Sequence, residues 1–343
     1  MSDWWKDKRV ALLGGASLIG THLANRLIEL DVRDLRIVDD FSSGKQSNVA
    51  HLIQDGVDVR SRELRDYFNA KSSVTGVDVV FHLAAQHGGR GYVASHDIEL
   101  YNNLELDTTI FRACADANVE KVIFSSSACA YPIDLQTNID EFVYLTEDLI
   151  DYKNMRQADG AYGMEKLMGE AMLDAYISAG KFKGCSTRSF TVYGPLMNES
   201  HAIAALIAKT MIRQKPFEIW GDGMQIRNWT HVEDNVEGAI LAAEKMERGA
   251  INIGIEDRLT PIMASLLIWE LMGWKPDLTD LKLMPDKPVG PRNRVADASK
   301  LKSLGWMPKS TFRKGLENTI EWYLSTHNEK DVRESLERKL TER

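Results

Sequence analysis

Near its start the chain reads Val10-Ala11-Leu12-Leu13-Gly14-Gly15-Ala16-Ser17-Leu18-Ile19-Gly20, and this stretch decides the fold. Its first four residues form a short apolar run, which is typical of a buried strand. The glycines that follow suit a tight turn, and Leu23, Leu27 and Leu30 then recur at helical spacing. The stretch therefore predicts a strand, a turn and a helix whose N-terminus can hold a phosphate group.

The same pattern recurs along the first half of the chain. Further apolar runs lie at 35–38, 77–83 and 121–125, each after a helix-like stretch such as 104–117. Alternating strands and helices predict a parallel sheet with helices on both faces. We therefore expect an α/β protein built on a Rossmann-type, doubly wound parallel sheet.

The alternation weakens after about Gly194. Candidate helices follow at 203–213, 232–248 and 261–273, and candidate strands at 217–220 and 250–253. We predict a Rossmann domain at 1–194 that also receives the segment of about 228–250, and a smaller, mainly substrate-binding α/β domain at 195–343. The charged stretch 328–343 is typical of a solvated terminal helix.

Composition excludes several classes of partner. The formal net charge of -8 disfavours nucleic acid and anionic membranes, since both reward a basic surface. A hydrophobic content of 44% with 27% charged residues is typical of a soluble globular chain. Three cysteines lack metal-ligand spacing, and no apolar stretch has signal or membrane-span length. We expect a cytoplasmic protein with no metal site and no membrane or nucleic-acid partner.

The first turn and the second strand carry a dinucleotide pattern. Gly14, Gly15 and Gly20 stand where a glycine fingerprint lets a pyrophosphate approach the backbone, and Ser17 replaces the middle glycine. Glycine pairs also make structural turns, so this motif alone is weak. Asp39, 19 residues beyond Gly20, ends a strand candidate where a carboxylate can bind the adenosine ribose. Because a carboxylate repels a 2′-phosphate, the pattern predicts NAD rather than NADP.

A tyrosine and a lysine suggest a base for removing a hydroxyl proton. Tyr162 and Lys166 are four residues apart, which places them on one face of a helix. A phenol has an ordinary pKa of about 10, so it needs a nearby cation to act as a base near neutral pH. As a bare pair this spacing usually marks a solvated helix face, but Ser127 upstream and the dinucleotide pattern favour a catalytic group.

Together these motifs resemble the extended short-chain dehydrogenase/reductase superfamily, in its nucleotide-sugar-modifying branch. The resemblance rests on Gly14 to Gly20, His82-Leu83-Ala84-Ala85, Ser125-Ser126-Ser127, Tyr162 with Lys166, Tyr193-Gly194-Pro195, 220–227 and 294–297. It implies a nucleotide-diphosphate sugar substrate and a homodimer. It also implies further NAD contacts from Leu18, Ile19, Leu83, Ala84, Ala85 and Asn103.

Within that branch, the segments 84–91, 101–103, 127–132 and 217–223 resemble GDP-mannose 3,5-epimerases. In those enzymes a cysteine and a lysine exchange protons with the sugar carbons that flank a transient ketone. Cys129 matches the cysteine, whereas His201 occupies the position of the lysine. A cysteine paired with a histidine resembles GDP-fucose synthases. Read alone, Cys129 would be a small buried residue and His201 a helix cap, but the resemblance implies that both are catalytic.

The chemistry suits these residue types. Oxidation of a sugar hydroxyl at C4 to a ketone acidifies the protons on C3 and C5, and two acid/base groups can then invert a centre by removing and returning a proton. A thiol and an imidazole, with ordinary pKa values of about 8.5 and about 6.5, are usable proton carriers. The remaining cysteines, Cys114 and Cys185, we expect to be structural.

Positive charge is needed locally to hold a diphosphate. The resemblance supports Arg227 and Arg294, whose planar guanidinium groups match phosphate oxygens; Lys209 and Arg188 are further candidates. Other predicted substrate contacts are Thr191, where many relatives have asparagine, and the loop residues Gly88, Gly89 and Arg90.

The leading hypothesis is an NAD-dependent nucleotide-sugar epimerase that inverts C5, C3 or both, similar to GDP-mannose 3,5-epimerase. In this hypothesis Tyr162 takes the C4 hydroxyl proton with help from Lys166 and Ser127, and Cys129 and His201 exchange the carbon protons. The alternatives are a 4-epimerase, a dehydratase or a ketosugar epimerase/reductase of the same superfamily. A non-catalytic dinucleotide sensor is disfavoured because the serine, tyrosine and lysine are all present.

Overall fold

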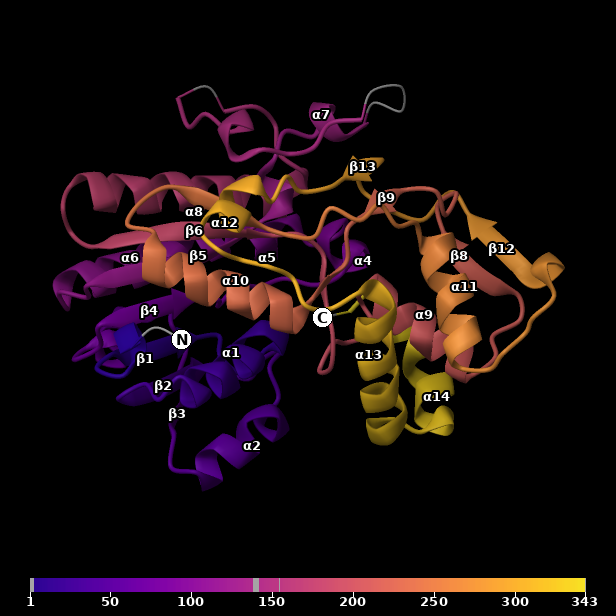
Figure 1. The fold of residues 1–343 in the computed structure, drawn as a ribbon, viewed down its shortest axis with the longest axis horizontal. Coiled ribbons are helices and arrows are strands. Elements are labelled where there is room, and N and C mark those ends of the chain that lie inside the picture. Colours follow the sequence, from indigo (N-terminus) through magenta and orange to yellow (C-terminus); the bar gives the residue numbers. More distant parts are fainter. Residues whose placement is uncertain (1–2, 138–141, 154, 343) are drawn as a thin grey trace.

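A seven-stranded parallel sheet forms the centre of the larger part of the molecule (Figure 1). The computed structural model describes residues 3–137, 142–153 and 155–342. The strand order is β11-β6-β5-β4-β1-β2-β3, and each neighbouring pair is parallel. This order contains the arrangement 3-2-1-4-5-6 of a dinucleotide-binding sheet, so the predicted Rossmann-type fold is confirmed.

The strands of this sheet are β1 (Arg9–Leu13), β2 (Asp34–Asp39), β3 (Asp58–Ser61), β4 (Val79–His82), β5 (Lys121–Ser127), β6 (Lys183–Ser189) and β11 (Ala250–Ile253). The helices that follow the chain through this part are α1 (Leu18–Glu29), α2 (Gln46–Gln54), α3 (Tyr67–Val74), α4 (Arg90–Val93), α5 (Asp97–Tyr101), α6 (Asn103–Asp116), α7 (Asp134–Thr137) and α8 (Gly160–Ser178). Later in the chain come α9 (Ala202–Met211), α10 (Val232–Lys245), α11 (Pro261–Leu271), α12 (Ser299–Ser303), α13 (Phe312–Thr326) and α14 (Glu329–Lys339).

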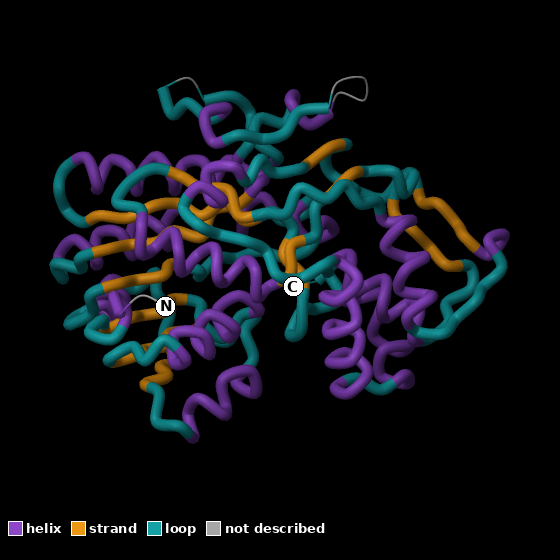
Figure 2. The backbone as a smooth tube through the Cα atoms, viewed as in Figure 1, coloured by secondary structure: helices purple, strands orange, loops and turns teal. Residues whose placement is uncertain are grey.

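Two hydrophobic layers enclose the sheet, one on each of its faces, and helices pack around the strands (Figure 2). Along β1, Val10 and Leu12 belong to the layer covered by α1 and α10. Ala11 and Leu13 point into the other layer, which is covered by α3, α6 and α8. Because successive side chains of a strand face opposite sides, the short apolar run fills both layers, as a doubly covered strand requires.

Three strands of the sheet differ from what the sequence indicates, and the first of them is β3, which has one apolar residue in Asp58–Ser61 and is not predicted. β6 carries Cys185, Ser186, Thr187 and Arg188, so it has no apolar run to announce it, yet these residues are buried. β11 pairs with β6 at the edge of the main sheet, so the sheet extends past the segment of about 228–250. The division of the chain into two domains stays a prediction.

A second hydrophobic cluster lies beside the sheet, built from α9, α11, α13 and α14. It also holds β8 (Phe217–Trp220), which pairs with β12 (Leu281–Met284). The charged helix α14 is solvated on one face only, since Val332 and Leu336 are buried against α9. Within the described residues, no helix is both long and apolar enough to cross a membrane.

Short parallel pairs connect the two parts. β7 (Val192–Tyr193) pairs with β10 (Thr230–His231), and β9 (Ile226–Arg227) pairs with β13 (Asn293–Arg294). In the second pair Arg294 lies opposite Arg227. Two arginines that are far apart in the sequence are thus brought side by side.

Candidate active site

A cavity of about 680 Å³ opens at the carboxyl ends of β1, β2, β4 and β5 and reaches the second helix cluster. Ligands of open parallel sheets bind at this edge. All predicted site residues except Gly15, Gly20 and Arg188 line the cavity. These residues are Gly14, Ser17, Leu18, Ile19, Asp39, Leu83, Ala84, Ala85, Gly88, Gly89, Arg90, Asn103, Ser127, Cys129, Tyr162, Lys166, Thr191, His201, Lys209, Arg227 and Arg294.

The glycine turn forms a cradle that side chains would fill. Gly14 has a φ of +81°, and a Cβ there would lie 2.6 Å from the backbone nitrogen of Ala84. Gly20 packs α1 against the turn, because a Cβ there would lie 2.6 Å from Cα of Gly15. Ser17 is the N-cap of α1: its hydroxyl donates to the carbonyl of Gly14 and accepts from the amide of Gly20. The first turn of α1 therefore faces the cavity with its backbone exposed to an anion.

The carboxylate of Asp39 closes one end of this cradle. It is 7% exposed and accepts hydrogen bonds from the amides of Ala16 and Phe41, both at 2.9 Å. A fixed carboxylate at the end of β2 suits the hydroxyls of an adenosine ribose. Asn103 is buried, and its side-chain amide accepts a hydrogen bond from the backbone amide of Gln86 and donates one to the carbonyl of Gln86. It therefore holds the loop after β4 in place. The cradle, the helix N-terminus and Asp39 fit NAD.

Tyr162 and Lys166 lie one turn apart on α8, both buried at the cavity wall. The ammonium group of Lys166 is 5.6 Å from the centre of the Tyr162 ring. Ser127, at the end of β5, accepts a hydrogen bond from the amide of Cys129 at 3.1 Å. Burial raises the pKa of Tyr162, while the charge of Lys166 and hydrogen bonding to Ser127 lower it. The predicted cation is in place, but it does not fully offset burial.

Sequence reasoning missed a buried carboxyl beside that lysine. Glu165 Oε1 lies 3.3 Å from the ammonium of Lys166, and both side chains are inaccessible to solvent. Burial and the neighbouring Asp107 together raise the pKa of Glu165 to about 8, against the opposing charge of Lys166. Asp107 is also hydrogen-bonded to His82 at 2.8 Å. A buried acidic group therefore lies beside the ammonium of Lys166. The sequence shows that Glu165 precedes Lys166 but not that its side chain is buried.

Cys129 sits on the short helix that follows β5, packed against the cluster that contains Tyr162. Its sulfur accepts a hydrogen bond of 3.0 Å from Nη1 of Arg294. Gly163 lets the start of α8 lie close to the backbone of Cys129, because a Cβ there would overlap the carbonyl oxygen of Cys129. This thiol differs from an unreactive, fully buried cysteine in two ways: it is partly exposed at the cavity, and its sulfur accepts a hydrogen bond from a guanidinium group.

Three arginines and one aspartate surround the thiol. Asp159 forms ion pairs with Arg90 and with Arg294, the latter at 2.8 Å. Burial alone would raise the pKa of Asp159, but the two guanidinium groups hold it well below its usual range. Arg227 bonds only to carbonyl oxygens among the described residues, and burial together with Arg294 and Arg90 lowers its pKa. Three positive charges against one negative leave an excess of two, which matches a diphosphate.

His201 is the N-cap residue of α9, yet its side chain makes no capping bond. Its Nδ1 lies 2.9 Å from Oδ1 of Asn198 and 3.2 Å from the hydroxyl of Ser200. Burial lowers the pKa of His201 to about 4. His87, which sequence reasoning did not single out, has its ring centre 5.4 Å from that of Tyr162 and 5.3 Å from that of His201. It thus bridges the tyrosine and the second predicted proton carrier.

The loop residues Gly88, Gly89 and Arg90 line the cavity together with Thr191. A Cβ at Gly89 would overlap the carbonyl oxygen of Ser200, so glycine is required where the two loops meet. Thr191 has a φ of 40°, an unusual conformation for a threonine, and lies on the cavity wall.

The remaining candidates divide between the cavity and the core. Lys209 lines the cavity, where burial lowers its pKa to about 8. Arg188 is 1% exposed and paired with Glu170 at 2.7 Å, so it belongs to the core and not to a clamp. Cys114 and Cys185 are buried, and burial raises both thiol pKa values. Of the described residues, none form a cluster able to hold a metal ion.

Comparison with known proteins agrees with this site. Residues 10–254 match the NAD dependent epimerase/dehydratase family, and the chain belongs to that family. This confirms the predicted superfamily and NAD as the cofactor, and it makes the protein an enzyme of the nucleotide-sugar epimerase fold.

Individual relatives include epimerases of more than one kind, dTDP-D-glucose 4,6-dehydratases and a GDP-L-fucose synthase. Over 93% of its length the chain is 27% identical to GDP-mannose 3,5-epimerase 1 of Oryza sativa subsp. japonica, covering 82% of that protein. It is 30% identical to the uncharacterized UDP-glucose epimerase YtcB of Bacillus subtilis, with 93% of this chain and 98% of that protein covered. A solved UDP-N-acetylglucosamine 4-epimerase of Methanobrevibacter ruminantium superposes with a TM-score of 0.81 at 27% identity, covering 94% of this chain and all of that one.

Proposed function

We propose that this enzyme epimerises a nucleotide-diphosphate sugar at C5, C3 or both, in the manner of GDP-mannose 3,5-epimerase. The observation that carries the proposal is that Cys129, His201 and Tyr162 come from three different elements and line one cavity. Simple 4-epimerisation needs neither the thiol nor the imidazole. Oxidation at C4 followed by proton exchange at the neighbouring carbons uses all three groups.

The first step removes the proton of the C4 hydroxyl. The phenolate of Tyr162 accepts it, with Ser127 as the hydrogen-bonding partner and Lys166 as the stabilising charge. NAD, when bound, supplies a positively charged ring and a hydride acceptor that later returns the hydride. Additional positive charge in the cavity would further lower the pKa of Tyr162, which burial raises.

The second step exchanges carbon protons beside the C4 ketone. His201 has no carboxylate partner among the described residues and a pKa of about 4, so it is neutral at pH 7 and can accept a proton. Cys129 offers a thiol with an exchangeable proton, and its sulfur accepts a hydrogen bond from Arg294. Neutral His201 removes the carbon proton and the Cys129 thiol gives its proton to the opposite face, which inverts the centre without net redox change. The imidazolium and the thiolate that result return to their starting states by exchanging protons with solvent.

The substrate would be held by its diphosphate. Arg227 and Arg294 lie opposite each other on β9 and β13, and the cluster around them has an excess of two positive charges. The loop 88–91, with Gly88, Gly89 and Arg90, would face the sugar, and Thr191 would offer a hydroxyl to it. A second copy of the chain is the expected partner in a homodimer.

A dehydratase is disfavoured by the state of its acid candidate. Such an enzyme requires an acidic group near Cys129, and Asp159 is the carboxylate that the fold brings there. Its ion pairs with two arginines keep it ionised, so it has no proton to give to a leaving hydroxyl. A 4-epimerase is the second candidate, favoured by similarity to the UDP-N-acetylglucosamine 4-epimerase.

Product analysis tests the proposal. The protein is incubated with NAD and, in turn, GDP-mannose, UDP-glucose, UDP-N-acetylglucosamine and dTDP-glucose, and each product sugar is identified by NMR. The expected products differ from their substrate at C5 or C3. Products inverted only at C4 would replace the proposal with 4-epimerisation, and loss of water would indicate a dehydratase.

A further inference from the structure

The loop that leads to His201 is held by a buried carboxylate. Glu199 is 3% exposed, two residues before His201, and its neighbours Asn198 and Ser200 form the hydrogen bonds that hold the imidazole. The amide of Ser200 and its hydroxyl both donate to Oδ1 of Asn198. Whatever fixes Glu199 therefore fixes the position of the imidazole.

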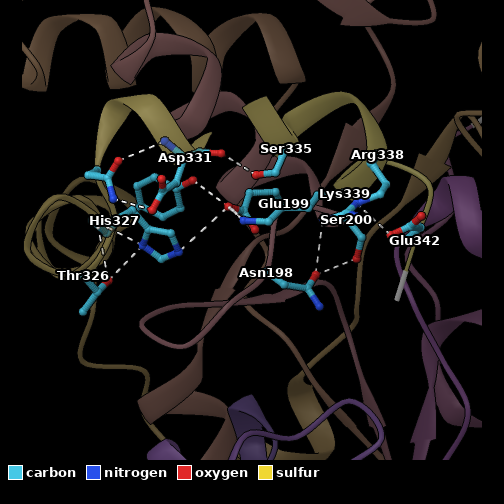
Figure 3. Close-up of polar contacts among 12 residues, drawn as sticks. Asn198, Glu199, Ser200, Thr326, His327, Asp331, Ser335, Arg338, Lys339 and Glu342 are labelled. Atoms are coloured by element: carbon cyan, nitrogen blue, oxygen red, sulfur yellow. Dashed lines mark hydrogen bonds and ion pairs between the residues drawn. The ribbon is translucent and has the colours of Figure 1, made fainter. Parts of the chain in front are cut away.

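The partners of Glu199 come from the last two helices. The hydroxyl of Tyr323 on α13 and the ammonium of Lys339 on α14 both donate to Oε1 of Glu199 at 2.8 Å. Figure 3 shows the carboxylate of Glu199 between His327 and Lys339. Burial alone would raise the pKa of Glu199, but Lys339 and Tyr323 lower it, so the carboxylate stays ionised. An ionised buried carboxylate depends strongly on its partners.

Helix α14 holds α9 at both ends. Arg333, near the start of α14, donates to the carbonyl of Ile212, the C-cap of α9, at 2.8 Å. Lys339, at the other end of α14, reaches Glu199 just before α9 begins. The two helices therefore run antiparallel, with Val332 and Leu336 buried between them. This pairing fixes α9 along its axis and hence the position of its N-cap residue, His201.

The end of α14 also touches the loop 88–91 beside the cavity. A Cβ at Gly91 would lie 2.8 Å from the carbonyl oxygen of Leu340. The neighbouring Gly89 donates its amide to the hydroxyl of Ser200 at 3.2 Å. Residues 88–91, residues 198–201 and the end of α14 thus form one packed unit beside the cavity.

We propose that Lys339 and Glu199 are positioning residues for His201, and that α14 acts as a latch on the His201 loop. The proposal rests on the proposed function, in which His201 exchanges a carbon proton. Loss of the ion pair would leave a buried carboxylate with only the Tyr323 hydroxyl and the more distant His327 near it. The loop would then become more mobile, and the imidazole would leave the position needed for proton transfer. Tyr162 and Lys166 on α8, which assist the oxidation at C4, would stay in place.

The test uses Lys339→Met, because the Lys339 side chain is 36% exposed and its loss should not prevent folding. Lys330→Met, on the exposed face of the same helix, is the matched control, and Lys339→Arg is the rescue. Amide hydrogen exchange across 196–205 is measured for all variants in the full chain. We expect exchange about tenfold faster in Lys339→Met and unchanged in the other two.

The reaction is then followed in two parts with the best substrate. In Lys339→Met, solvent deuterium uptake at the sugar carbons should fall about tenfold or more, while the transient reduction of the cofactor stays within about twofold. Lys339→Arg should restore uptake. Unchanged amide exchange in Lys339→Met, or equal loss of both reaction steps, would overturn the latch. If the native enzyme exchanges no carbon protons, the proposed function fails, and amide exchange still decides whether the latch exists.

Discussion

At the scale of single residues, the surroundings of the Cys129 thiol are set by contacts with residues that are distant in the sequence. The sequence predicts the residue from its place in a family motif, yet the Arg294 guanidinium on its sulfur comes from 165 positions away. Likewise the position of Glu165 before Lys166 is visible, but its burial is not. Residue types at fixed spacing are readable in a sequence; charges that converge through the fold are not.

Replacing the thiol separates its catalytic role from a packing role. Cys129→Ala should abolish carbon-proton exchange, because alanine carries no exchangeable proton, while NAD binding stays within about twofold since the cradle is untouched. Isothermal titration with NAD and NMR of the sugar protons measure the two effects. Cys185→Ala, in the core, is the control. Carbon-proton exchange at the native rate in Cys129→Ala would show that the thiol has only a packing role.

Arg227 is expected to lower the stability of the free protein and to strengthen the binding of a diphosphate ligand. It lacks a carboxylate partner among the described residues, so Arg227→Met should raise the stability of the free protein by about 1 kcal/mol. The same change should weaken binding of GDP at least about tenfold, because a diphosphate contact is lost. Thermal unfolding with and without GDP reports both, with the exposed Lys275→Met as control. GDP affinity equal to the native value would contradict the clamp.

At the scale of elements, α8 is the helix that ties the chemistry together. It carries Tyr162 and Lys166, and its first turn meets the backbone of Cys129 through Gly163. The sequence predicts this helix from its motif and predicts most strands of the sheet from apolar runs. It does not predict β3, which has one apolar residue, or β6, whose buried Arg188 forms an ion pair with Glu170 on α8.

The close approach at Gly163 can be tested by adding a single carbon. Gly163→Ala should push the start of α8 away from Cys129, destabilise the fold by about 1–3 kcal/mol and slow turnover. Met168→Ala, on the exposed face of the same helix, should leave turnover unchanged. Urea unfolding and steady-state rates measure both. A variant with native rates would show that the spacing between α8 and the thiol is unimportant.

At the scale of the whole molecule, the cavity exists because a parallel sheet and a separate helix cluster meet at the carboxyl edge of the strands. The sheet was predictable, since alternating strand and helix patterns leave few topologies. The second cluster was predictable as helices but not as an arrangement, because helix order alone does not say which faces meet. That is why the loop at His201 and its partners on α14 had no signal in the sequence.

The buried histidine makes the stability of the whole fold depend on pH. His201 has a pKa of about 4 in the folded chain and an ordinary value near 6.5 when unfolded. Its contribution is present above 6.5 and is lost as the pH falls toward 4, because only the unfolded chain then binds the proton. When the pH is lowered from 6.5 to 4, the free energy of unfolding should fall by about 1–2 kcal/mol less in His201→Asn than in the native protein. Denaturant titrations at both pH values measure this difference. Parallel curves would mean that folding does not lower the pKa of His201.

The proposed reaction requires carbon protons to exchange beside a C4 ketone, and turnover in deuterium oxide measures this exchange. The enzyme is incubated with NAD and a nucleotide sugar that it turns over, and the sugar is analysed by NMR at each ring position. We predict solvent deuterium at C5, C3 or both, with the original hydrogen kept at C4. Turnover that retains every carbon-bound hydrogen would contradict the account and leave a 4-epimerase in its place.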